Sequence, residues 1–97
     1  MTTMVILDIY TKPDRLEEMR DFLRDALPVA LAYEGSLGVE VVENMDVPGN
    51  IVFYEKWESR KHYENYYAFR EASGVLGAFV EMLTKEPEIR YFETYEM

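Results

Sequence analysis

The chain has 97 residues, no cysteine, one histidine and a formal net charge of −9. This length suits a single domain, expected to span residues 1–97, and a composition of 48% hydrophobic and 30% charged residues is typical of a folded protein. The negative charge argues against nucleic acid and anionic membrane surfaces as partners. The lack of cysteine excludes disulfides, thiol catalysis and thiolate metal sites, and no ligand-spaced cluster predicts a metal. With no basic segment before the first apolar stretch, we expect a cytoplasmic protein.

The first third of the chain predicts a strand and then a helix. Residues 4–10 are rich in β-branched and aromatic side chains and end at the turn sequence TKPD. Asp14 and Glu17 are spaced as a capping pair for the helix that follows. Apolar residues then recur three and four positions apart, at Leu16, Met19, Leu23, Leu27 and Ala30. Pro28 is expected to kink this helix or end its regular part, and Gly35 to close the segment.

The middle and end of the chain predict a hairpin, a broken helix and a last strand. Residues 37–44 and 51–57 form the hairpin, with Leu37, Val39 and Val41 on one face of its first strand. Ser59 is a natural N-cap for the next helix. That helix breaks at the sequence EASG, and a short helical piece follows at 75–83. Residues 88–95 form the final strand.

This order, β-α-β-β-α-β, predicts an α+β protein with the ferredoxin-like fold. Its four-stranded antiparallel sheet carries helices on a single face. The first and third strands are nevertheless apolar on both faces, so the sheet presents a second apolar surface larger than a monomer usually exposes. We therefore expect a homodimer in which two such sheets pack together.

The sequence YEKWES, residues 54–59, resembles the motif Tyr-Glu-x-Trp-x-Ser of the antibiotic biosynthesis monooxygenase domains. These domains form part of the dimeric α+β barrel superfamily. The resemblance extends to the element order and the chain length. It implies a cavity between sheet and helices for a small aromatic phenol or quinol, which the best-known members oxygenate with O₂ and no cofactor. Such chemistry requires a base, stabilisation of the anion and exclusion of water.

Three residues carry the predicted catalytic site. The resemblance gives Trp57 the role of stacking on the substrate ring and aiming its N–H at a substrate oxygen, and gives Tyr63 a hydrogen bond to a substrate oxygen. Glu55 shares a strand face with Trp57 because side chains alternate along a strand. A desolvated Glu55 would have a raised pKa and could act as base. Each of the three could instead be structural, with Trp57 and Tyr63 in the core and Glu55 paired to an arginine or a backbone N–H.

Five further residues are candidates for substrate binding. They are Phe53, His62, Tyr66, Tyr67 and Arg70. Tyr66 and Tyr67 could line the pocket mouth or only pack, Arg70 could face an anionic substrate or form an ion pair, and His62 could face solvent. Two of the five depart from the family pattern, since some members have asparagine where Phe53 stands and a histidine is common at the position of Tyr66.

The resulting hypothesis is a cofactor-independent monooxygenase that acts on a small phenol or quinol. No histidine lies near Leu76, where the related haem-degrading proteins carry their ligand, so haem is not expected. A dimeric barrel that binds a small hydrophobic molecule without catalysis is an alternative. An isomerase or cyclase of the same superfamily, using the pocket for proton transfer without O₂, is another.

Overall fold

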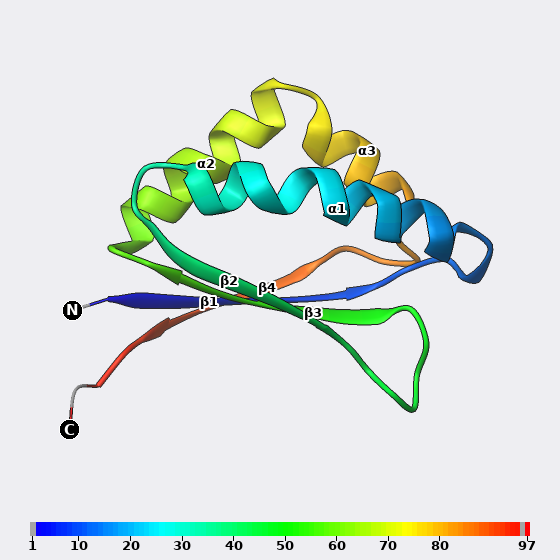
Figure 1. The fold of residues 1–97 in the computed structure, drawn as a ribbon, viewed down its shortest axis with the longest axis horizontal. Coiled ribbons are helices and arrows are strands. Elements are labelled where there is room, and N and C mark those ends of the chain that lie inside the picture. Colours follow the sequence, from blue (N-terminus) through cyan, green and yellow to red (C-terminus); the bar gives the residue numbers. More distant parts are fainter. Residues whose placement is uncertain (1, 96) are drawn as a thin grey trace.

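The computed structural model describes residues 2–95 and 97, and within them a four-stranded antiparallel sheet carries all its helices on one face (Figure 1). The strands are β1 (Thr3–Tyr10), β2 (Ser36–Glu43), β3 (Asn50–Trp57) and β4 (Glu88–Glu93), in the spatial order β2-β3-β1-β4. The helices are α1 (Leu16–Ala32), α2 (Arg60–Ala72) and α3 (Val75–Glu81), with a 3-10 turn η1 (Pro13–Arg15) before α1. The predicted ferredoxin-like fold is confirmed.

The helix boundaries confirm one predicted cap and correct another. Ser59 is the N-cap of α2, and its hydroxyl accepts the backbone N–H of His62 at 3.2 Å. The predicted capping pair of Asp14 and Glu17 is wrong, because η1 takes up Asp14 and α1 begins after Arg15 without a side-chain cap.

Pro28 does not end α1, which continues past it to Ala32. Leu23 and Ala30 lie two turns apart on either side of the proline, and both are buried on the core face. Their packing against the sheet offsets the single backbone hydrogen bond that proline removes.

The inward-facing residues of the sheet form two adjoining core clusters under the helices. One contains Leu7, Ile9, Ile51 and Phe53 from the strands with residues from the helices. The other is smaller and aromatic, built on Val5, Trp57 and Tyr63. The two clusters lie side by side on the same face of β1 and β3. The alternation of side chains along these strands therefore determines which residues face the helices.

A bulge in β2 changes the predicted inward face of that strand. The pairing with β3 shifts between Ser36 and Gly38, which leaves Leu37 as the extra residue. Leu37 is therefore half exposed, whereas Val39 and Val41 pair with Glu55 and Phe53 and share their inward face.

Within the residues that the structure describes, the opposite face of the sheet carries no helix (Figure 1). Its apolar side chains come from all four strands: Met4, Ile6, Tyr10, Val42, Val52, Tyr54 and Phe92. Three of these, Val42, Tyr54 and Phe92, are 39–43% exposed. Apolar side chains thus lie on both faces of β1 and β3, as the sequence predicts, and the uncovered face also carries the charged side chains Asp8, Glu40, Lys56, Glu88 and Arg90. No helix in the described part of the chain is both long and apolar enough to cross a membrane.

Candidate functional site

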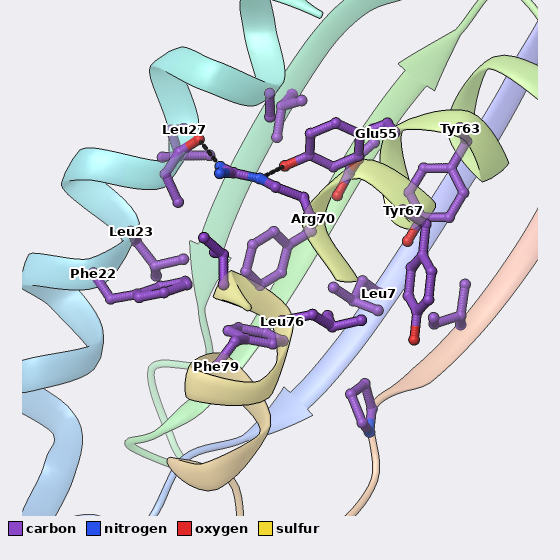
Figure 2. Close-up of a pocket in the computed structure, with 18 residues that line it drawn as sticks. Leu7, Phe22, Leu23, Leu27, Glu55, Tyr63, Tyr67, Arg70, Leu76 and Phe79 are labelled. Carbon is purple, nitrogen blue, oxygen red and sulfur yellow. Dashed lines mark hydrogen bonds between the residues drawn. The ribbon is translucent and has the colours of Figure 1, made fainter. Parts of the chain in front are cut away.

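A cavity of about 80 Å³ lies between the inner face of the sheet and the three helices (Figure 2). Most of its wall is apolar, and its polar side chains are Glu55, Arg70 and the tyrosines at positions 63, 66 and 67. For scale, an engineered apolar cavity of roughly 150 Å³ binds benzene. A single aromatic ring therefore requires modest widening of this cavity, and a fused ring system requires considerably more.

Among the described residues, Glu55 is the one carboxylate on the cavity wall, and it is buried. It points inward from the centre of β3, with a residue exposure of 5%. Burial raises the pKa of Glu55 from its ordinary value of 4.5 to about 7, and the hydrogen bond from Trp57 partly opposes this rise. The indole N–H of Trp57 donates to Oε1 of Glu55 at 3.1 Å. Near neutral pH, Glu55 can therefore both accept and return a proton.

Trp57 positions Glu55 and does not contact the cavity. Its side chain is fully buried, and its ring packs against Tyr63 and Tyr66 at centroid distances of 5.8 and 5.3 Å. It is absent from the cavity wall, and its single donor is already used by Glu55. The structure thus disagrees with a Trp57 that stacks on the substrate and donates to it, because the tryptophan lies behind the carboxylate.

Three tyrosines of α2 form the aromatic side of the cavity. Tyr63 is 3% exposed, and burial raises its pKa, with the nearby Glu55 adding to the effect. Burial also raises the pKa of Tyr66, although the hydrogen bond from Arg70 opposes it. Tyr63 packs against Tyr67 at 6.3 Å. Both Tyr63 and Tyr66 therefore keep their phenolic protons at neutral pH, so Tyr63 can donate a hydrogen bond to a ligand oxygen.

Arg70 spans the gap between α2 and α1 at the cavity wall (Figure 2). Its Nε donates to the hydroxyl of Tyr66 at 2.9 Å, and a terminal nitrogen donates to the backbone carbonyl of Ala26 at 2.9 Å. The ion pair with Glu55 that the sequence left open does not form. Glu55 and Arg70 thus both lie on the cavity wall, and each forms hydrogen bonds to neutral groups instead of to the other.

Of the remaining two candidates for substrate binding, Phe53 lies on the cavity wall and His62 does not. Phe53 lines the cavity and packs edge-on against Phe79 at 6.1 Å, so it supplies apolar surface where some family members carry an amide. His62 lies outside the cavity wall. Its Nδ1 is 2.7 Å from the hydroxyl of Ser59, and its ring lies where a Cβ at Gly35 would be. A ligand-binding role for His62 has no support in this geometry, because the side chain packs the start of α2 against the α1–β2 turn.

The helical wall opposite Glu55 is not among the site residues predicted from the sequence. This wall consists of Phe22, Leu23, Ala26, Leu27 and Ala30 from α1, and Val75, Leu76 and Phe79 from α3. Three of the α1 residues belong to the helical stripe predicted as core, and the stripe alone does not distinguish core from cavity lining. Within residues 2–95 and 97, no three histidine, aspartate or glutamate side chains cluster to hold a metal ion.

Comparison with known proteins identifies the family. The model of the family described as antibiotic biosynthesis monooxygenase matches residues 2–75, about three quarters of the chain. The chain belongs to the antibiotic biosynthesis monooxygenase family. No curated protein gives a significant match.

Solved structures share the fold of this family member at low sequence identity. A conserved protein from Methanosarcina mazei Go1 is 18% identical, with a TM-score of 0.88 over 97% of this chain and 93% of the other. A structure described as an antibiotic biosynthesis monooxygenase is 15% identical, with a TM-score of 0.87 over 97% and 99%. A protein from Mycobacterium tuberculosis is 20% identical, with a TM-score of 0.81 over 100% and 98%. These similarities establish the fold and leave the substrate open.

Replacing Glu55 should change how stability depends on pH. Because the pKa of Glu55 is about 7 in the folded chain against 4.5 ordinarily, the unfolded chain releases this proton at lower pH than the folded chain. The free energy of unfolding therefore falls as pH rises through that window, by about 3 kcal/mol in total. In Glu55→Gln this contribution should vanish, as measured by urea unfolding between pH 5 and 8 at fixed protein concentration. The exposed Glu71→Gln serves as control, and an unchanged pH dependence in Glu55→Gln would contradict the assignment.

Removing the indole donor should raise the pKa of Glu55 further. Trp57→Phe retains an aromatic ring but loses the N–H that stabilises the ionised carboxylate. We expect the pKa to increase by roughly one pH unit, the equivalent of one ordinary hydrogen bond. An NMR titration of ¹³C-labelled glutamate carboxyls measures it. Tyr33→Phe, in the neighbouring aromatic cluster, should leave the pKa of Glu55 unchanged, and a fall in Trp57→Phe would exclude the proposed role of the indole.

Proposed function

We propose that this protein is a cofactor-independent monooxygenase that uses O₂ to oxidise a small phenol or quinol bound between the sheet and the helices. The observation that carries the proposal is the buried Glu55, whose pKa is about 7, on the wall of an otherwise apolar cavity. Membership of the antibiotic biosynthesis monooxygenase family supports the same class of reaction.

Glu55 begins the reaction by taking the phenolic proton. The resulting anion is electron-rich and transfers one electron to O₂, which gives an aryloxyl radical and superoxide. These combine at a ring carbon that carries hydrogen, forming a carbon–oxygen bond, and the peroxide anion takes up the proton held by Glu55. Glu55 then removes the ring C–H proton as the O–O bond breaks, which leaves a quinone and hydroxide, and hydroxide takes up this proton to depart as water. One O₂ is consumed for each quinone and each water produced. Glu55 receives the proton in the first step and supplies one for the departing water.

The surrounding residues support this sequence of steps. Tyr63 keeps its proton and can donate to a ligand oxygen, and Phe53 with the leucines of α1 keeps water from the anion. Trp57 acts through Glu55, since its N–H fixes the orientation of the carboxylate. The same base could also move a proton between two ligand atoms without O₂, which is the isomerase alternative.

We further propose that two copies of the chain pack through the uncovered faces of their sheets. Seven apolar side chains on that face come from four strands, and three of them are 39–43% exposed. A surface of this kind on a sheet is ordinarily covered by another molecule. The cavity lies on the opposite side of the sheet, so dimerisation through this face leaves it accessible.

Oxygen uptake tests the proposed reaction. Single-ring phenols and quinols, with anthrone as a polycyclic comparison, would be incubated with the protein and a metal chelator. We expect O₂ uptake with quinone formation, a loss of roughly 100-fold or more in Glu55→Gln, and a rate that increases with pH to a plateau above about 7, because the base must be ionised.

The outcomes separate the alternatives. Product formed equally under argon would indicate isomerisation, and binding without turnover would indicate a binding protein. Full turnover in Glu55→Gln, with Glu71→Gln as the matched control, would exclude Glu55 as base.

Sedimentation equilibrium tests the assembly. At micromolar concentration we expect about twice the chain mass of 11.5 kDa. Ile6→Glu places a charge at the centre of the uncovered face, beside Tyr54 and Arg90 in register, and should shift the protein to the monomer mass. Val29→Glu, at an exposed position of α1, is the matched control and should remain dimeric. A folded wild-type monomer would contradict the proposal.

A further inference from the structure

Arg70 differs from every other arginine of the chain in its partners. Among the described residues, five of the six arginines form ion pairs with aspartate or glutamate: Arg15, Arg20, Arg24, Arg60 and Arg90. Arg70 forms none, although the chain contains 19 acidic residues. Its side chain, on a residue of intermediate exposure, lies instead on the cavity wall. A guanidinium at a cavity wall without an acidic partner is available to bind an anionic group of a ligand.

Two neutral groups hold this guanidinium in place without using all its donors. Nε donates to Tyr66 and a terminal nitrogen to the carbonyl of Ala26, each at 2.9 Å. A guanidinium has five N–H groups, so three remain without a partner among the described residues. Asp25 lies with Arg70 on a neighbouring shallow groove, but the two form no ion pair. The cation is thus pre-positioned with donors to spare.

We propose that Arg70 binds a carboxylate on the ligand, and that the substrates are single-ring hydroxyaryl carboxylates with the hydroxyl group toward Glu55. The parallel N–H groups of a guanidinium match the two oxygens of a carboxylate. A cavity of about 80 Å³ favours one ring over several. The orientation toward Glu55 rests on the proposed function, whereas carboxylate selection at Arg70 rests on the unpaired guanidinium alone. The net charge of −9 disfavours the binding of anions in general. The preference for a carboxylate on the ligand therefore depends on the local positive charge of Arg70.

Binding of a matched pair of compounds tests this selection. The dissociation constants of 4-hydroxybenzoate and its neutral amide, 4-hydroxybenzamide, would be measured by NMR titration at pH 7.5 and low salt. We expect wild type to bind the carboxylate at least tenfold more tightly than the amide, the range of a charge-assisted hydrogen-bonded pair. Arg70→Met should abolish the preference while leaving amide binding within about threefold, and Arg70→Lys should give an intermediate ratio because it keeps the charge but loses the fork.

Arg24→Met is the control for loss of one positive charge. Arg24 is exposed on α1 and paired with Asp21, and its replacement should leave the wild-type preference intact. Equal binding of the two compounds to wild type, binding of neither, or an unchanged ratio in Arg70→Met would each overturn the inference. If Arg70→Met fails to fold, Arg70→Lys and the salt dependence of wild-type binding provide the test. The inference is overturned if Arg70→Lys keeps the wild-type preference for the carboxylate and wild type binds 4-hydroxybenzoate equally well at high and low salt.

This readout is independent of oxygen chemistry. Turnover of neutral phenols without a carboxylate preference would overturn the inference and leave the proposed function intact. Carboxylate preference without O₂ uptake would support the role of Arg70 and contradict the monooxygenase.

Discussion

The burial of one carboxyl group, that of Glu55, is the constraint on which the rest of the site depends. Taking this group out of water costs about 3 kcal/mol above its folded pKa, and within the described residues a single side-chain donor, the indole of Trp57, partly offsets that cost. An arginine in that place would have held the pKa of Glu55 low and removed its basicity. A neutral N–H orients the carboxyl while leaving its proton exchangeable near neutral pH. The packing of the sheet and helices around Glu55 must then offset the free-energy cost of burying it.

The alternation of side chains along β3 allows one strand to serve two surfaces. Phe53, Glu55 and Trp57 point to the helices, whereas Val52 and Tyr54 point to the uncovered face. A shift of one residue in the pairing with β1 would move Glu55 to the opposite side of the sheet, away from the cavity. Eight paired positions along β1 fix that register. The packing that holds the site together and the surface proposed for dimerisation therefore have the same origin in the strand pattern.

Much of the fold could be predicted from the sequence because its signals are local. The apolar periodicity of α1, the Ser59 cap and the two-sided strands each depend on residues within a few positions of one another. The site was harder to predict. Strand alternation places Glu55 and Trp57 on one face, but it does not show that the indole N–H bonds to the carboxylate and thereby turns away from the cavity. The bulge at Leu37 and the continuation of α1 past Pro28 likewise depend on tertiary packing, which local patterns do not encode.

Glu55 and Arg70 line the same cavity without pairing, and this separation explains how opposite charges can both remain available to a ligand. The neutral partners of each group are different: Trp57 for the carboxyl, and Tyr66 with the carbonyl of Ala26 for the guanidinium. Tyr66 connects the two arrangements, since its ring packs on Trp57 at 5.3 Å and its hydroxyl accepts from Arg70. The aromatic cluster on α2 is therefore more than packing. Its Tyr66 contacts both the tryptophan that bonds to Glu55 and the guanidinium of Arg70, so the proposed base and the proposed carboxylate-binding cation are held at two places around one cavity.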